Sequence, residues 1–193
     1  MTSDQPCLIA VGANIPSAAG DPAETVAAAL GHLSETGGGV VAISGYYRTP
    51  AFPPGSGPDF VNAAAVLRTA EGPEAVLARL HAAEARFARR RDVRWGPRTL
   101  DLDLIAMGDA LLPDAATQAA WRGLDAAAQR SRVPDRLILP HPRMQERAFV
   151  LVPLADVAPG WRHPALGRTV SQMVAALPEA ARTEVVPLSN QSL

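Results

Sequence analysis

The chain has 193 residues, a formal net charge of −1 and 48% hydrophobic residues. This length suits one globular domain with a sizeable core, and the charge excludes a global positive field that would recruit nucleic acid. The single cysteine, Cys7, excludes an internal disulfide and a cysteine-built zinc site. Because the sequence shows no secretory signal and no apolar stretch of ~18 residues, we expect a cytoplasmic protein with no membrane partner. The near-zero charge also predicts no nucleic-acid partner, and a monomer is expected.

The predicted elements begin with a buried strand over 7–11, which ends in a turn at 12–14. A helix is expected to begin after Asp21, because Pro22 suits the first helical position and Glu24 the third. A strand over 40–49, a stiff proline-rich loop over 50–58 and a strand over 60–68 follow. A second helix from 71–74, a basic loop over 89–97 and a strand over 99–107 complete the order βαββαβ. This order predicts the ferredoxin-like α+β fold, an antiparallel sheet with both helices on one side.

The C-terminal half predicts additional helices on the same single domain, 1–193. Residues 113–134 are rich in Ala, Gln and Arg and predict an inserted helical excursion, which Trp121 and Leu124 are suited to dock onto the body. A proline-bounded segment over 140–159 predicts a short helix, and 169–177 predicts the last one. The tail at 183–188 is expected to be frayed or to form an edge strand.

A pair of carboxylates in the strand over 99–107 is the first candidate site. Asp101 and Asp103 alternate with leucines, so they share the face opposite the leucines and lie about 6–7 Å apart along the strand. Two such groups suit Mg²⁺, which favours oxygen ligands and keeps waters and substrate phosphates in its remaining positions. For the bare pattern alone, a solvated strand face or pairing with nearby arginines is the favoured interpretation.

The loop that precedes the carboxylates favours the metal interpretation. It is dense in arginine, whose planar donor forks fit phosphate oxygens, and a metal–triphosphate complex needs such cations around it. The alternative is a solvated basic loop, in which Trp95 is an anchor and not a stacking lid. The loop arginines are Arg89, Arg90, Arg91, Arg94 and Arg98.

Two further clusters carry candidate residues, and the first of them suits a flat ring. Phe60 and Asn62 share one strand face, where an aromatic ring can stack on a ligand and an amide can read its edge. A core phenylalanine beside a capping asparagine is the alternative. His141 lies between two prolines on a rigid loop, where it is more often structural than catalytic. The sequence has no P-loop, no GxGxxG after the first strand and no protein-kinase signature set.

Taken together, several segments resemble the 6-hydroxymethyl-7,8-dihydropterin pyrophosphokinase family, from about residue 8 to about residue 159. The family has a ferredoxin-like α+β fold, and its enzymes move the β,γ-pyrophosphoryl group of ATP to the hydroxymethyl oxygen of the pterin and release AMP. The block at 94–103 is highly specific, and the others are strong together. The segments are YYRTP at 46–50, PDFVNAA at 58–64, RWGPRTLDLD at 94–103, PHP at 140–142 and RAF at 147–149.

The resemblance implies a role for each matching residue. It implies that Asp101 and Asp103 bind two Mg²⁺ ions around the triphosphate and that arginines of the loop act on the phosphates. The implied catalytic residues are Arg89, Arg91, Arg98, Asp101 and Asp103. The implied ATP contacts are Glu84, Arg91, Trp95, Arg98, His141 and Arg147. The implied pterin contacts are Thr49, Pro50, Phe60, Asn62, Trp95 and Phe149.

Ala13 departs from the family pattern, because it stands where the family usually has a serine. Two other functions use the same residues. A D-x-D nucleotidyltransferase would release pyrophosphate instead of AMP, and a ferredoxin-like RNA-binding module would use the basic loop and exposed aromatics. The net charge of −1 and the 5% aromatic content count against RNA binding.

Overall fold

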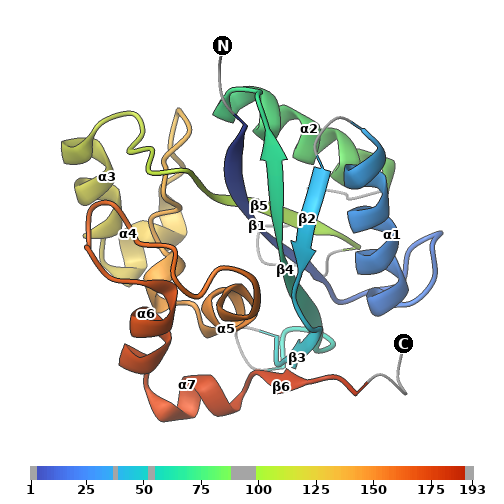
Figure 1. The fold of residues 1–193 in the computed structure, drawn as a ribbon. Helices are drawn as coiled ribbons and strands as arrows, with labels where there is room; N and C mark the ends of the chain where they lie inside the picture. Colours follow the sequence, from blue (N-terminus) through green and yellow to red (C-terminus); the bar gives the residue numbers. More distant parts are fainter. Residues whose placement is uncertain (1–3, 37–38, 52–54, 88–98, 190–193) are drawn as a thin grey trace.

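A computed structural model describes residues 4–36, 39–51, 55–87 and 99–189 of the chain. It shows a mixed α/β architecture in which helices cover both faces of an antiparallel sheet (Figure 1). None of the helices in the described ranges combines the length and the apolar character that crossing a lipid bilayer requires.

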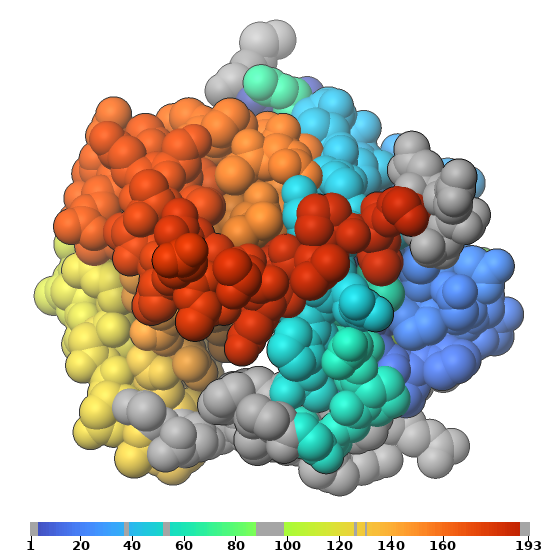
Figure 2. Space-filling view, turned by 90° about the horizontal axis from the view of Figure 1, so that it is seen from below, coloured from blue at the N-terminus to red at the C-terminus, as the bar shows by residue number. Residues whose placement is uncertain are grey.

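The sheet contains the predicted strands in a defined order. The strands are β1 (Gln5–Ala13), β2 (Gly39–Ile43), β3 (Tyr47–Thr49), β4 (Phe60–Thr69), β5 (Asp101–Met107) and β6 (Val186–Pro187). Their order is β5-β1-β4-β3-β6, β2 also pairs with β4, and every pair is antiparallel. The short β6 confirms the expected edge strand, and Figure 2 shows the red C-terminal segment that contains it crossing the surface next to cyan atoms.

Two long helices pack on one face of the sheet, α1 (Pro22–Glu35) and α2 (Pro73–Arg86). The predicted start of α1 is confirmed, because the Asp21 carboxylate accepts from the Glu24 N–H and the Glu24 carboxylate accepts from the Asp21 N–H. The remaining helices are α3 (Ala115–Arg122), α4 (Ala126–Ser131), the 3-10 turn η1 (Met144–Glu146), α5 (Ala148–Val157), α6 (Val170–Ala176) and α7 (Glu179–Thr183).

The sheet separates two hydrophobic cores. Leu102 and Leu104 of β5 face the first core, which they share with α1 and α2, as the alternation predicts. The opposite face is not simply solvated, because Ile105 is fully buried in a second core formed with α5 and α6. Asp101 and Asp103 precede Ile105 on this second face and are only partly exposed. The carboxylates therefore lie where the cover provided by the C-terminal helices ends.

The predicted strand over 40–49 is wrong in one respect, since the structure divides it into β2 and β3. The break at 44–46 has a physical reason: the Ser44 hydroxyl accepts a hydrogen bond from the Ala64 N–H at 2.8 Å, while the Gly45 N–H donates to Asp156 of α5 at 3.0 Å. A register shift between Val40 and Ala42 also interrupts the pairing of β2 with β4. Side chains from distant segments thus replace part of the strand ladder.

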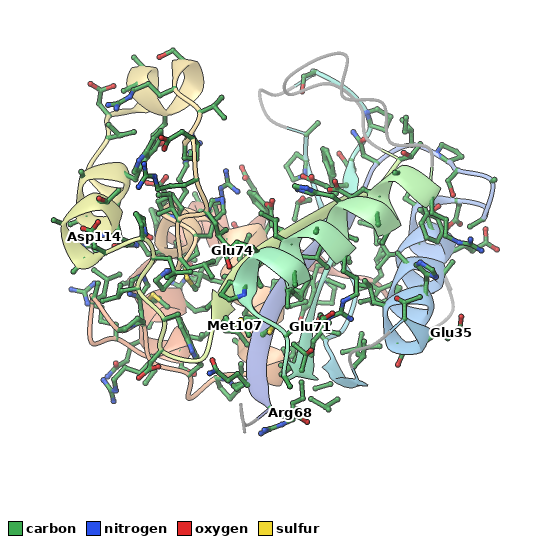
Figure 3. The ribbon with its side chains drawn as sticks, turned by 90° about the horizontal axis from the view of Figure 1, so that it is seen from above. Glu35, Arg68, Glu71, Glu74, Met107 and Asp114 are labelled. Carbon is green, nitrogen blue, oxygen red and sulfur yellow. The ribbon has the colours of Figure 1, made fainter. Side chains whose placement is uncertain are left out.

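The residues of the predicted excursion form α3 and α4, with Asp114 and Asp125 as N-caps. Figure 3 shows these helices as a lobe beside the sheet, with Asp114 on the opposite side of the molecule from Glu35 of α1. The lobe is tied to the body by the fully buried Gln118, whose amide donates to the Pro140 carbonyl at 3.3 Å. Trp121 and Leu124, which are expected to dock the excursion, are partly buried, and a polar side chain contributes to its attachment.

A buried histidine between α5 and α6 predicts a pH dependence of stability. His163 has no exposed surface, and its Nδ1 accepts from the N–H groups of Ala165 and Leu166. Burial lowers the pKa of His163 to about 4, and the nearby Arg122 charge acts in the same direction. The unfolded chain, with an ordinary histidine pKa near 6.5, therefore binds a proton that the folded protein does not bind between pH 6.5 and 4.

We expect the wild-type protein to lose roughly 3 kcal/mol more stability than His163→Gln as the pH falls from 7 to 4, because a shift of one pKa unit corresponds to about 1.4 kcal/mol. Above pH 7.5 this contribution to the pH slope vanishes. Urea unfolding at a series of pH values, carried out on both proteins, measures the difference. If the plots of unfolding free energy against pH were parallel for the two proteins, His163 would not titrate differently in the folded and unfolded states between pH 7 and 4.

Candidate functional site

The register of three strands brings the predicted site residues together at one end of the sheet. Gly12 of β1 pairs with Asn62 of β4 on one side and with Asp101 of β5 on the other. Neighbouring strands lie about 4.8 Å apart, so Asn62 and Asp101 lie about 10 Å apart across β1. Ala10 pairs with Asp103, and Thr49 of β3 pairs with Phe60. One row of residues therefore runs from an aromatic and an amide to a pair of carboxylates.

Asn62 is held rigidly at the centre of this row. Its side chain is 6% exposed, and its Nδ2 donates to the Thr49 hydroxyl at 2.7 Å. Gly12 makes this position available, because a Cβ at residue 12 would lie 2.8 Å from Asn62 Oδ1 and 3.8 Å from the Phe60 ring. The glycine thus gives the amide and the ring room to lie over β1.

A buried arginine faces the carboxylates from the start of α5. Arg147 Nη1 lies 3.7 Å from Asp103 Oδ2, and the side chains are 16% and 39% exposed. Burial lowers the pKa of Arg147, although Asp103 opposes this shift, and the guanidinium stays charged at neutral pH. The centre of the guanidinium lies 5.7 Å from the centroid of the Phe149 ring. Phe149 is 40% exposed, although its side chain is large and apolar. Positive charge and an exposed aromatic surface therefore meet at the same helix end.

His141 lies on the loop beside β5. The backbone N–H of His141 donates to the Ile105 carbonyl at 2.7 Å, and its ring Nδ1 accepts from the backbone N–H of Arg143 at 3.1 Å. Burial lowers the pKa of His141 to about 3, with the charges of Arg147 and Arg143 acting in the same direction. The ring is therefore neutral at pH 7 and carries its proton on Nε2, where it can donate to a ligand. Gln118 of the excursion supports this loop through Pro140.

Glu84 of α2 is buried and contacts the carboxylate strand from behind. Its Oε1 accepts from the Leu102 N–H at 2.9 Å, between Asp101 and Asp103 in the chain. This contact is with the strand backbone on the side of the first core. A direct contact between Glu84 and ATP stays a prediction.

The structure describes only some of the remaining residues that are predicted to form the site. Pro50 follows β3 and is exposed next to Thr49. The predicted residues of the basic loop, Arg89, Arg91, Trp95 and Arg98, lie outside the described residues. One feature of the site is not predicted by the sequence: Gly12 has a role in placing Asn62, whereas its local pattern indicates only a turn.

The donor set at the carboxylate end fits magnesium. Asp101 and Asp103 are neighbouring carboxylates on one strand face, and both are partly exposed. Within the described ranges, no group of three or more histidine, cysteine, aspartate or glutamate side chains is placed to hold a metal ion. A site with few protein ligands is what Mg²⁺ uses when substrate phosphates complete its coordination.

The chain has close relatives among bacterial enzymes. It is 37% identical over 181 residues to a Synechocystis sp. protein, "2-amino-4-hydroxy-6-hydroxymethyldihydropteridine pyrophosphokinase", covering 93% of this chain and 80% of that protein. It is 40% identical over 173 residues to the Pseudomonas aeruginosa protein of the same name, covering 88% and 90%.

A solved structure shares the fold. The wild-type Plasmodium falciparum HPPK-DHPS structure superposes with a TM-score of 0.60 at 14% identity, over 89% of this chain and 41% of that one. The chain thus spans less than half of that two-part protein. The family described as 7,8-dihydro-6-hydroxymethylpterin-pyrophosphokinase (HPPK) matches residues 8–159. This chain therefore belongs to the 7,8-dihydro-6-hydroxymethylpterin-pyrophosphokinase family.

Proposed function

We propose that the protein transfers pyrophosphate from ATP to the hydroxymethyl group of 6-hydroxymethyl-7,8-dihydropterin and releases AMP, as a step of folate biosynthesis. The observation that carries the proposal is the row of residues across β4, β1 and β5. It places the Asn62 amide about 10 Å from Asp101 across β1, with Phe60 and Asp103 two residues away along their own strands. A flat heterocycle and a metal-bound triphosphate can therefore occupy adjacent parts of one site.

The pterin end of the site is formed by side chains from three elements, β3, β4 and α5. Phe60 of β4 and Phe149 of α5 provide ring faces for stacking. Asn62 supplies both a carbonyl oxygen and an amide, and the hydrogen bond to Thr49 fixes its orientation. The exposure of the Phe149 ring, 40%, has a reason in this proposal, because a bound pterin would cover it.

The phosphate end is formed by Asp101, Asp103, Arg147 and His141. The carboxylates would hold two Mg²⁺ ions, which reduce the negative charge that the triphosphate presents to the nucleophile. Arg147 contributes a buried positive charge beside them, and neutral His141 offers its Nε2–H as a donor to the nucleotide. The phosphate oxygens are proposed to be bound by Arg89, Arg91 and Arg98. Trp95 is proposed to contact both the pterin and the nucleotide.

In the reaction, the hydroxymethyl oxygen forms a bond to the β-phosphorus of ATP. The bond between that phosphorus and the oxygen bridging to the α-phosphorus breaks, AMP leaves with this oxygen, and the hydroxyl proton passes to solvent. The protein contributes by positioning the two substrates and by stabilising charge, because phosphoryl-type transfer needs little covalent chemistry from side chains.

An assay of AMP release with ATP, magnesium and 6-hydroxymethyl-7,8-dihydropterin tests the proposal. We expect AMP to form in equal amounts with pterin pyrophosphate. Release of free pyrophosphate would support a nucleotidyltransferase instead, and no turnover with any of these substrates would overturn the proposal.

The proposal includes several finer statements. The strand order supports assigning the sheet to the ferredoxin-like fold, with β2 and β3 together in the place of its second strand. We also propose a monomer in the cytoplasm. Light scattering coupled to gel filtration would test whether the protein is a monomer, and a mass near 40 kDa instead of 20.2 kDa would contradict that proposal.

Gly12→Ala tests the pterin end of the site. The added Cβ would lie 2.8 Å from Asn62 Oδ1, so the amide must move and its bond to Thr49 must weaken. We expect pterin affinity to fall on the order of tenfold, the equivalent of about 1.4 kcal/mol, while ATP affinity stays within twofold. Calorimetric titration of both ligands measures the difference.

Gly31→Ala is the matched control, because it lies in α1 and an added Cβ there meets nothing within 4 Å. It is expected to leave both affinities unchanged and to stabilise the fold by about 0.5–1 kcal/mol, as alanine does within a helix. If Gly12→Ala bound the pterin as tightly as the wild type, the proposed placement of Asn62 at the ligand would be wrong.

A further inference from the structure

A hydrogen-bonded link joins the end of α5 to the start of β3 and to the turn before it. Asp156 Oδ2 accepts from the Tyr47 hydroxyl at 2.8 Å and from the Gly45 N–H at 3.0 Å. The residues are more than one hundred positions apart in the chain. Burial raises the pKa of Tyr47 to about 12, and the hydrogen bond to Asp156 contributes in the same direction, so the phenol stays protonated and donates. Figure 2 shows the orange and cyan segments that carry these residues in contact.

The same face of α5 carries both this link and an edge of the proposed pterin site. Phe149 and Asp156 are seven residues apart, which is close to two helical turns, so their side chains leave α5 on the same side about 10.5 Å apart. Phe149 stands in the first turn of α5, and Asp156 stands in its last turn. A shift of α5 against the sheet would therefore move Phe149 and Asp156 together.

The strand on the other side of the link also leads into the site. Tyr47 pairs directly with Asn62 in the register of β3 and β4, and Thr49, which accepts from the Asn62 amide, lies two residues further on. Because β3 has three residues and its outer neighbour β6 has two, the sheet alone holds this segment weakly. Contacts with α5 are therefore needed to set its position.

We propose that Asp156 is a positioning residue of the pterin site. By binding Tyr47 and Gly45, it sets the separation between Phe149 on α5 and the Thr49–Asn62 pair on β3 and β4. It touches neither substrate, and it acts through the two sides of the site that it joins. The inference rests on the proposed function, because it names what positions the pterin-binding residues.

Binding measurements on Asp156→Ala test the inference. We expect the dissociation constant of 6-hydroxymethylpterin, measured by calorimetry with magnesium and α,β-methylene-ATP present, to rise on the order of five- to tenfold. The dissociation constant of α,β-methylene-ATP with magnesium should stay within twofold. A merely structural role would lower the thermal midpoint and leave both constants unchanged, which would overturn the inference.

Two further variants isolate the link. Tyr47→Phe removes only the hydroxyl and should weaken pterin binding by part of the same factor, while Tyr47→Phe/Asp156→Ala should bind no more weakly than Asp156→Ala. Asp156→Asn keeps an acceptor oxygen and should restore most of the affinity. Additive effects of Tyr47→Phe and Asp156→Ala would overturn the inference, because they would show that the two residues act separately.

Glu35→Ala is the matched control, since Glu35 is also an exposed acid in the last turn of a helix, α1. It should change neither dissociation constant. If the wild-type protein bound no pterin, the proposed function and this inference would both fail. If the wild type bound pterin and Asp156→Ala bound it equally well, only the inference would fail.

Discussion

Asp103→Ala is expected to reduce kcat for pyrophosphate transfer on the order of 10³-fold, an effect typical of losing a group that stabilises developing charge. Asp103 lies on the second face of β5, beside the buried guanidinium of Arg147 and at the edge of the cover formed by α5. Without its carboxylate, the proposed magnesium site would lose one of its two protein ligands, and the triphosphate would be positioned less precisely. Asp101→Ala should have an effect of similar size, for the same reason.

The fold should survive either change. Asp103 is 39% exposed, and its ion pair with Arg147 at 3.7 Å should contribute no more than about 1 kcal/mol to stability. Asp109→Ala, an exposed acid in the turn after β5, is the matched control and should retain full activity. Steady-state AMP release, with circular dichroism for folding, measures both properties. Turnover near the wild-type rate by Asp103→Ala in magnesium would falsify the metal assignment.

Local sequence patterns predicted most elements because their causes are local. The Asp21–Glu24 capping box fixes the start of α1 through contacts that span three residues. The alternation of leucines with Asp101 and Asp103 fixes which side of β5 faces α1 and α2. The break between β2 and β3 was not predictable in this way, because Gly45 is bonded to a residue of α5 that lies 111 positions away in the chain.

The site shows the same division. The types of its residues, two carboxylates, an amide and aromatics, were evident from spacing and from the resemblance of their segments to a family. Their arrangement depends on the pairing of Gly12 with both Asn62 and Asp101, which no single segment contains. The second core was also missed, since Ile105 follows the carboxylates on a face whose cover comes from α5 and α6.

Phe149→Ala is expected to weaken pterin binding by about 1–3 kcal/mol, which is the range for stacking of a base on an aromatic side chain and corresponds to roughly 5- to 150-fold. The ring is exposed at the start of α5, next to the Arg147 guanidinium, and a stacked ligand would cover it. Because the ring is not part of the buried core, its removal should change stability little. ATP affinity should stay within threefold, since Arg147 and His141 are retained.

Calorimetry with 6-hydroxymethylpterin and with α,β-methylene-ATP, each in magnesium, separates the two ligands. Val41→Ala is a suitable control, because Val41 is 56% exposed on β2 and lies outside the row of site residues. It should leave both affinities unchanged. Equal losses of pterin and nucleotide affinity in Phe149→Ala would contradict a stacking role, and they would mean that the side chain acts through the position of Arg147. Such an effect has a structural basis, because the guanidinium lies 5.7 Å from the centroid of the ring. The ratio of the loss in pterin affinity to the loss in nucleotide affinity distinguishes it from stacking.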